Sequence, residues 1–228
     1  MADPHFLTNT LAWIRVHRAG LGLLVLGWMI PWLLFVDLAE NVWQNEGFVR
    51  DKALLAWLQA HRRPSLDAVA VLLSRLGGTV AMWTFCLGLI AGMLLARQRW
   101  QAGLVGANMA GTWVLHLAVK AWLERARPAE WDPLVEEPPI PAMVYSFPSG
   151  HAIAAAALVT AFILLLWPTR WRWPALVLGT AWAAAMGLAR MYLGAHYASD
   201  VAAGWVGSIG WVMGVYLLFF RAYRLAEK

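Results

Sequence analysis

The chain has 228 residues, of which 61% are hydrophobic and only 14% are charged, and it contains 16 tryptophans. Soluble domains carry about a quarter charged residues, so this composition excludes an ordinary soluble protein and also a disordered one. The formal net charge of +5 does not indicate nucleic-acid binding, because the basic residues form no stripe. The single cysteine, Cys86, lies in an apolar run and cannot form an intrachain disulfide. The composition predicts an integral membrane protein, which we expect to form one domain over residues 1–228.

Hydropathy predicts an all-α, polytopic protein with six transmembrane helices, since a spanning helix needs about 20 mostly apolar residues. The fourth run is short and reaches this length only if its helix begins near Ser149. The first run is not a cleaved signal peptide, because it is long and no small-residue cleavage site follows it. Pro31 inside this run is expected to kink its helix. The predicted spans are Ala19–Val36, Thr79–Ala96, Gln101–Val119, Ala152–Trp167, Trp173–Ala189 and Val201–Phe220.

Two further helices are expected between the first and second spans. Asn41–Arg63 mixes Trp, Leu and charged residues, which is typical of an interfacial amphipathic helix. Ser65–Leu76 is expected to form a short helix that the Gly77–Gly78 pair separates from the following span.

Charge asymmetry between the connections predicts the orientation. With six spans, the side that holds both termini carries nine basic and two acidic residues, a net charge of +7. The other side carries nine basic and eleven acidic residues, a net charge of −2, and includes the long polar connection Glu124–Phe147. The positive side is therefore expected to be cytoplasmic, so that both termini are cytoplasmic and the chemistry takes place on the outer face. The nine basic residues are Arg15, Arg18, Arg97, Arg99, Arg170, Arg172, Arg221, Arg224 and Lys228.

Ionisable residues near a membrane interior are costly, so their positions are informative. The first of three polar clusters ends the third predicted span. Lys120 and Arg127 are almost two helical turns apart and would lie on one face of a helix that Pro128 ends. Alone, this pattern is also typical of a basic helix end that extends its side chains toward the membrane surface.

The second cluster, Pro148–His151, precedes the fourth predicted span and has the residue types of a helix start. Free backbone N–H groups at a helix N-terminus attract anions, and Gly150 would let a phosphate approach the backbone closely. The alternative interpretation is a capped helix with an interfacial histidine.

The third cluster connects the last two predicted spans. Arg190 ends the fifth span, and His196 and Asp200 begin the sixth with an i, i+4 spacing. A carboxylate at that position can hold one imidazole nitrogen and leave the other as a nucleophile or base. A simple helix cap is the alternative.

Together the three clusters bring two histidines, one carboxylate, three cations and a helix N-terminus to one level on one side of the membrane. Cations and backbone amides suit a phosphoryl group, because its transfer is catalysed mainly by positioning and charge stabilisation. Two histidines supply a nucleophile and a proton donor. This combination predicts phosphoryl-transfer chemistry.

The clusters closely resemble the type-2 phosphatidic acid phosphatase family, which contains membrane lipid phosphatases and related soluble vanadium haloperoxidases. The family pattern K-x6-R-P, P-S-G-H and S-R-x5-H-x3-D is matched in order and spacing by Lys120–Pro128, Pro148–His151 and Ala189–Asp200. Ala189 replaces the family serine, so one hydrogen bond to the phosphate is expected to be missing. The resemblance covers a motif-bearing core of about residues 65–220, and the composition excludes the soluble haloperoxidases.

The resemblance implies that His196 attacks phosphorus and forms a phosphohistidine, with Asp200 orienting its ring. It implies that His151 protonates the leaving lipid oxygen and then helps water to attack. No metal or other cofactor is implied, and the sequence shows no cluster with metal-ligand spacing. The residues implied to hold the phosphate oxygens are Lys120, Arg127, Ser149, Gly150 and Arg190.

Four nearby residues are weaker candidates. His116, one turn before Lys120, is expected mainly to pack behind the site, with contact to the site as the alternative. Glu124, Arg125 and Tyr192 are candidates for contacts with a lipid headgroup.

The predicted function is a metal-independent lipid phosphatase, expected in a bacterial cytoplasmic membrane with its active site on the periplasmic or extracellular side. Its partners would be the bilayer and a phosphorylated lipid: phosphatidate, phosphatidylglycerol phosphate or undecaprenyl diphosphate. One alternative is a lipid phosphotransferase that uses the same phosphohistidine. Another is a phospholipid-binding transporter, against which the chain shows no inverted repeat of interrupted helices. The sequence does not distinguish among these lipids, and it leaves the oligomeric state open.

Overall fold

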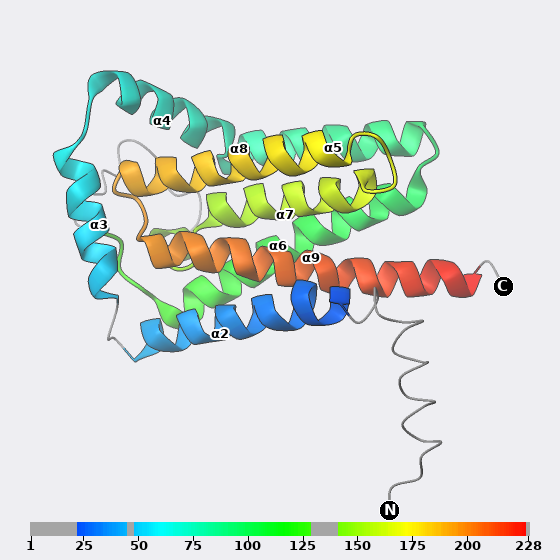
Figure 1. Cartoon of the computed structure of the whole chain (residues 1–228), viewed down its shortest axis with the longest axis horizontal. Helices are drawn as coiled ribbons and strands as arrows, with labels where there is room; N and C mark the ends of the chain where they lie inside the picture. Colours follow the sequence, from blue (N-terminus) through cyan, green and yellow to red (C-terminus); the bar gives the residue numbers. More distant parts are fainter. Residues whose placement is uncertain (1–21, 45–47, 129–140, 227–228) are drawn as a thin grey trace, which may run out of the picture.

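The computed structural model describes residues 22–44, 48–128 and 141–226, and all the regular structure in these ranges is helical. The long helices run side by side, and α3 lies across one end of the bundle (Figure 1). The elements are η1 (Leu23–Met29), α2 (Ile30–Trp43), α3 (Val49–Ala60), α4 (Pro64–Leu76), α5 (Thr79–Leu95), α6 (Arg99–Leu123), η3 (Pro141–Val144), α7 (Gly150–Leu166), α8 (Arg172–Tyr192) and α9 (Ala198–Ala226).

Within the described residues, four helical segments are long and apolar enough to cross a membrane, and α4 with α5 makes a fifth if the bent pair is one span. Taken alone, α5 and α7 are both too short, because the 17 residues of each extend about 25 Å against a hydrocarbon core of about 30 Å. The prediction of six spans therefore remains a prediction. The four segments are Leu24–Trp43, Arg99–Leu123, Arg172–Tyr192 and Ala198–Phe219.

Two predicted boundaries are confirmed. The Gly77–Gly78 pair separates α4 from α5, and the two helices are bent by 50° at this break. The helix α7 begins at Gly150, and the backbone N–H of Ala152 donates to the Ser149 hydroxyl at 3.5 Å, so Ser149 is its N-cap.

The predicted helix over Asn41–Arg63 is wrong as a single element. The first apolar helix continues past Val36 to Trp43, because the intervening residues include good helix formers and no breaker. A second helix, α3, then covers Val49–Ala60. The predicted start of the first span at residue 19 lies outside the described residues. Pro31 lies in the first turn of α2, directly after the π-helical turn η1.

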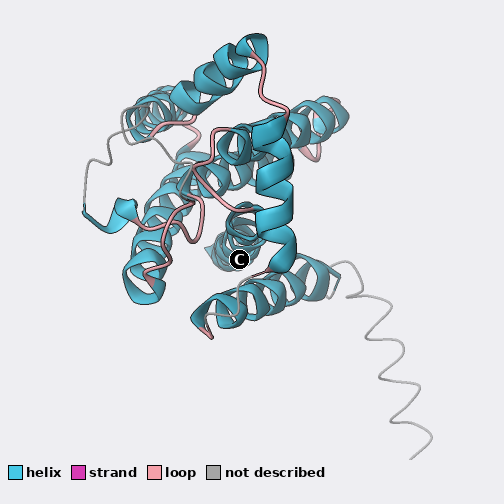
Figure 2. Ribbon diagram, turned by 90° about the vertical axis from the view of Figure 1, so that its left-hand side faces the viewer, coloured by secondary structure: helices cyan, strands magenta, loops and turns pink. Residues whose placement is uncertain are grey.

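The helix α3 docks on the protein through one face. Asp51, Leu55 and Leu58 follow one another at helical spacing and are buried, and α3 contacts α8 and α9. Figure 2 views the bundle from the end that α3 crosses. The placement of α3 at the membrane interface remains a prediction.

The centre of the bundle is α7, which packs against α6, α8 and α9. Its alanine-rich first half is almost fully buried and lets α9 approach closely. The Ser208 hydroxyl of α9 donates to the carbonyl oxygen of Ile153 at 2.9 Å, and Gly204 lies beside Ala152. This close contact sets the relative position of the two helix N-termini, α7 and α9.

We predict that Gly204→Ala lowers the free energy of unfolding by about 1–3 kcal/mol, the usual cost of overpacking. A Cβ at position 204 would lie 2.9 Å from the Cβ of Ala152 and 3.0 Å from the carbonyl oxygen of Ser149, and backbone cannot yield as a flexible side chain does. The measurement is the thermal unfolding midpoint in detergent. Gly88→Ala is the matched control, because its added Cβ would meet no described atom within 4 Å apart from its chain neighbours and the nearby backbone of its own helix. Equal midpoints for the two variants would contradict the tight contact.

Candidate active site

Four helix ends meet at the end of the bundle that α3 crosses: the C-termini of α6 and α8 and the N-termini of α7 and α9 (Figure 1). They surround a cavity of about 60 Å³, several times the roughly 10–15 Å³ that one water requires. The cavity therefore has room for a small tetrahedral anion. Six of the eight predicted site residues line it, namely Lys120, Arg127, Gly150, His151, Arg190 and His196.

Two of the cations in this cavity are almost completely buried. Lys120 and Arg190 are each only 1% exposed. The Lys120 ammonium donates to the backbone carbonyls of Tyr145 and Ser146, and an Arg190 Nη1 hydrogen bonds to the Ser74 hydroxyl. Burying cations is costly, and these neutral oxygens position the charges without cancelling them. The arrangement suits an anionic ligand.

Arg127 reaches the cavity by a different route from the predicted one. The helix α6 ends at Leu123, and Glu124 adopts the left-handed conformation with φ 47°, so Lys120 and Arg127 do not share a helix face. The prediction of a shared helix face is wrong because α6 ends at Leu123 and does not continue to Pro128. Instead, Arg127 donates to three backbone carbonyls: from Nε to Val144 at 2.9 Å, from Nη2 to Met143 at 2.8 Å and from Nη1 to Ala195 at 2.9 Å.

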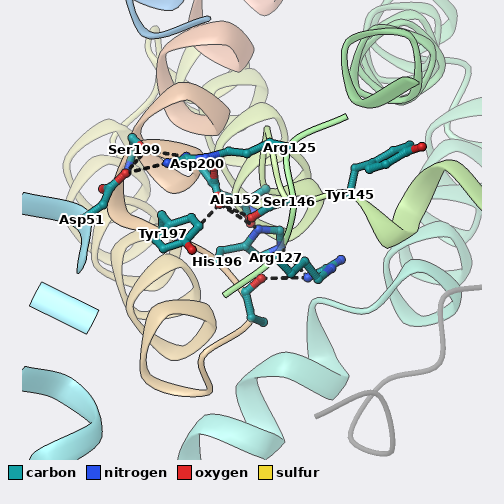
Figure 3. A network of polar contacts seen from close by, with 12 residues as sticks. Asp51, Arg125, Arg127, Tyr145, Ser146, Ala152, His196, Tyr197, Ser199 and Asp200 are labelled. Atoms are coloured by element: carbon teal, nitrogen blue, oxygen red, sulfur yellow. Dashed lines mark hydrogen bonds and ion pairs between the residues drawn. The ribbon is translucent and has the colours of Figure 1, made fainter. Parts of the chain in front are cut away.

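His196 lies in the turn before α9 and contacts both charged partners (Figure 3). Its Nε2 is 3.3 Å from Arg127 Nη1, and its Nδ1 is 3.5 Å from Asp200 Oδ2. The turn, and not a shared helix face, therefore brings the predicted His–Asp pair together. Burial and the neighbouring cations Arg127, Lys120 and Arg190 hold the pKa of His196 well below its usual value. A neutral imidazole keeps the lone pair that a nucleophile needs.

Asp200 lies behind His196, outside the cavity lining, and has no exposed surface. Its Oδ1 accepts a hydrogen bond from Arg125 Nη1 at 2.5 Å, and its Oδ2 accepts from the Ser146 hydroxyl and from the Tyr197 backbone N–H at 2.9 Å (Figure 3). The contact with Tyr197 is one half of a capping box at the start of α9. The two interpretations of this carboxylate, helix cap and partner of His196, are therefore compatible.

Arg125 is one of the weaker candidates for a lipid-headgroup contact, but its guanidinium points into the protein. Besides Asp200, it donates to Asp51 at 3.0 Å and to the Ser199 hydroxyl at 2.7 Å, and it lies over the Tyr197 ring at 4.4 Å from the centroid. Burial lowers the pKa of Arg125, but the Asp200 and Asp51 carboxylates more than offset this effect and raise it. Arg125 thus links α3 to α9 as a permanent cation.

Sequence reasoning missed two residues that support the site. Asp51 on α3 is 4% exposed and accepts hydrogen bonds from the Ser199 backbone N–H at 2.9 Å, from the Ser199 hydroxyl and from Arg125. Ser74 on α4 accepts from Arg190 through its hydroxyl, and its carbonyl oxygen accepts from His151 Nε2 at 3.1 Å. Asp51 is an acidic residue on a helix facing the protein, which is a weak signal. Ser74 gives no signal in the sequence.

The remaining candidates have structural positions. Ser149 caps α7 and donates its backbone N–H to the Asp200 carbonyl oxygen at 3.0 Å. Ala189 lies in an apolar cluster with Leu58. The Tyr192 hydroxyl accepts from the Arg63 backbone N–H at 2.8 Å. Across residues 22–44, 48–128 and 141–226, no group of three or more His, Cys, Asp or Glu side chains could hold a metal ion.

The fold and the cavity define a helical membrane protein with a cationic, histidine-containing site at one end of its bundle. Residues 101–224 match the PAP2 superfamily, and the chain belongs to this superfamily as a membrane lipid phosphatase of the PAP2 type.

Named relatives agree with this assignment. The chain is 31% identical over 202 residues to phosphatidylglycerophosphatase B of Bacillus subtilis (strain 168), covering 86% of this chain and 93% of the relative. It is 40% identical over 62 residues to an undecaprenyl-diphosphatase of Sulfolobus acidocaldarius, covering 27% of this chain and 28% of the relative.

Solved structures show the same fold. The crystal structure of a transmembrane PAP2 type phosphatidylglycerolphosphate phosphatase from Bacillus subtilis superimposes with a TM-score of 0.73 at 26% identity, covering 83% of this chain and 94% of that one. LpxE of Aquifex aeolicus superimposes with a TM-score of 0.57 at 22% identity, covering 76% of this chain and 97% of that one, which supports the fold alone.

We predict that Asp51→Asn destabilises the protein by about 3 kcal/mol, because it leaves the buried Arg125 charge with one carboxylate instead of two. The loss of this contact should also reduce phosphatase activity through Asp200. Asp67→Asn is the matched control, since its ion pair with Arg62 is exposed and such pairs contribute little to stability. Thermal unfolding and activity are measured for both variants. Equal losses would show that the Asp51 contact has no special role.

Proposed function

We propose that this protein hydrolyses a phosphomonoester or diphosphate of a membrane lipid at the extracytoplasmic face through a phosphohistidine intermediate. The main supporting observation is the cavity in which His151 and His196, three cations and the N-terminus of α7 converge. Substrate phosphate would be held by Lys120, Arg127 and Arg190 and by the α7 N-terminus, including Gly150 and Ser149. Ser149 would act mainly by capping that helix.

In the first step, His196 Nε2 attacks phosphorus, and the bond between phosphorus and the lipid oxygen breaks. The leaving oxygen takes a proton from the protonated imidazole of His151, which becomes neutral, and Asp200 stabilises the positive charge that develops on His196. In the second step, His151 takes a proton from a water molecule, whose oxygen attacks phosphorus. The bond to Nε2 then breaks, inorganic phosphate is released, and His196 returns to its neutral form.

This scheme routes no step through a metal, and we propose that the activity persists when a chelator is present. The three cations would stabilise charge on the equatorial oxygens, the task that metal ions perform in many other phosphoryl-transfer enzymes.

The proposals for the substrate and for the membrane face are supported by separate observations. Phosphatidylglycerol phosphate is the first lipid to test, because the B. subtilis relative matched over 86% of this chain is named for it. Undecaprenyl diphosphate is the second, from the relative that matches over a shorter segment. The outer face is supported by the excess of basic residues on the side that carries the termini.

We predict that His196→Ala lowers the rate of phosphate release by about two to four orders of magnitude, as expected when a nucleophile or base is removed. The assay uses purified protein in detergent with each lipid and a chelator, and orthovanadate should inhibit the wild type. His61→Ala is the matched control, because His61 lies at the exposed end of α3 against Trp57. Full activity in His196→Ala would refute the assigned roles. Transfer of the phosphoryl group to an added lipid alcohol instead of water would favour a phosphotransferase.

We also predict that the acidic limb of the kcat/KM profile lies below pH 6.5. His196 must be neutral to attack, and burial together with the nearby cations lowers its pKa below the ordinary value of 6.5. Arg127→Gln removes one of these cations, so the pKa of His196 should rise and the limb should move to higher pH, although the rate also falls. The titration of the substrate is common to both proteins. A limb at the same pH in both would contradict the assignment to His196.

A further inference from the structure

His116 is a buried imidazole in the cavity that the proposed mechanism does not use. It lies on α6 one turn before Lys120, is 2% exposed and lines the cavity. Its ring packs edge-on against Trp113 at 5.3 Å between centroids. Within the described part of the chain, His116 Nε2 has no hydrogen-bond partner. A buried polar nitrogen of this kind requires an explanation, and a bound ligand is one.

The position of Nε2 indicates which ligand group it would meet. A Cβ added to Gly150 would lie 3.0 Å from His116 Nε2, so the imidazole touches the first residue of α7. In that turn the N–H of Ala152 donates to the Ser149 hydroxyl and that of Ile153 to the Ser149 carbonyl oxygen. The N–H groups that come before them have no helical acceptor. His116 Nε2 and the anion-attracting end of α7 therefore face the same volume.

The depth of His116 along α6 adds a second constraint. Successive turns of this helix contribute Met109, Trp113, His116 and Lys120 to the cavity lining. The lining thus changes from mainly apolar to cationic, and His116 lies at the boundary; Thr112 on the apolar side donates its hydroxyl to the Asn108 carbonyl of its own helix. A ligand with a phosphate at Lys120 and a lipid tail toward Met109 would place the phosphate's lipid-facing side against this ring.

We propose that His116 is a phosphate-binding residue whose Nε2–H donates a hydrogen bond to a phosphoryl oxygen of the lipid beside the N-terminus of α7. This inference rests on the proposed function and extends it to a residue outside the three motifs. The ring's other nitrogen faces the Trp113 backbone carbonyl. Because the other nitrogen already carries a hydrogen, Nε2 takes its proton from the bound phosphate, which passes from monoanion to dianion, and the ring is then an imidazolium paired with that dianion. A charge at this depth is tolerated because its partner is an anion.

The first test compares inhibition by inorganic phosphate and by orthovanadate in three variants. His116→Leu removes the donor and should raise both inhibition constants about 10-fold to 100-fold, as expected for a hydrogen bond to a charged group. His116→Gln places an amide N–H near the former Nε2 and should recover most of this loss. His61→Leu makes the same chemical change outside the cavity and should leave the constants unchanged.

The second test measures the protonation of the His116 ring directly. Protein labelled with ¹⁵N at histidine is titrated with inorganic phosphate, and the spectrum of His116→Gln identifies the signal of His116. Both ring nitrogens of His116 should move to the shifts of an imidazolium, with half-saturation at the inhibition constant. This measurement remains decisive if His116→Leu fails to fold.

The outcomes separate the two proposals. If the wild type hydrolyses lipid phosphate but His116→Leu keeps inhibition constants within twofold and the ring signal does not move, the inference about His116 is overturned and the proposed function stands. If the wild type hydrolyses no lipid phosphate but phosphate still shifts the His116 signal, the proposed function fails and the anion site stands.

Discussion

The end of the bundle that holds the candidate active site depends on one buried carboxylate. Asp200 has no contact with solvent, and both of its oxygens are engaged by Arg125, the Ser146 hydroxyl and a backbone N–H. A buried charge that loses a partner costs several kcal/mol, so the segments that supply these partners must come together for any of them to be stable. The segment after α6, the approach to α7 and the start of α9 all converge here, and Asp51 adds α3 through Arg125. The position of His196 follows from this network.

Charges of opposite sign are separated around His196. Carboxylates lie behind the ring with Arg125, whereas the cations that face the cavity are held by serine hydroxyl and backbone carbonyl oxygens. The cavity therefore stays electropositive while the imidazole of His196 stays neutral. Preorganised cations stabilise developing negative charge without moving at the moment of reaction. The same separation explains why a bundle with so few charged residues places several of them in one small region.

Local features of this fold could be predicted from the sequence, and features that depend on distant partners could not. Hydropathy located the long helices, the Gly77–Gly78 pair located the break before α5, and Ser149 located the start of α7. The stop of α6 was misplaced because a proline is a visible signal and a left-handed Glu124 is not. The contact of Asp51 with Ser199 joins residues 148 positions apart, and that of Arg190 with Ser74 joins residues 116 apart. A single sequence carries no trace of such pairs.

The site residues show the same difference between local features and contacts with distant partners. The three motifs contain six residues that line the cavity, and these could be predicted because their chemistry and spacing are recognisable locally. The interactions that hold those groups, such as the Ser74 hydroxyl on Arg190, come from elements whose sequence is unremarkable in isolation. The sequence therefore predicted residues around the cavity but not the residues that hold them in place.

The left-handed residue at the end of α6 has a consequence for the two arginines that follow it. In a helix, residues two positions apart point about 200° away from each other, whereas in an extended chain they point to the same side. Arg125 contacts Asp200, and Arg127 contacts Nε2 of His196, the residue that is paired with Asp200. One more turn of α6 would aim the two guanidinium groups in opposite directions. The left-handed conformation of Glu124, at φ 47°, has a steric cost of about 1–2 kcal/mol. It lets Arg125 and Arg127 contact Asp200 and His196 together, which an uninterrupted helix would not allow.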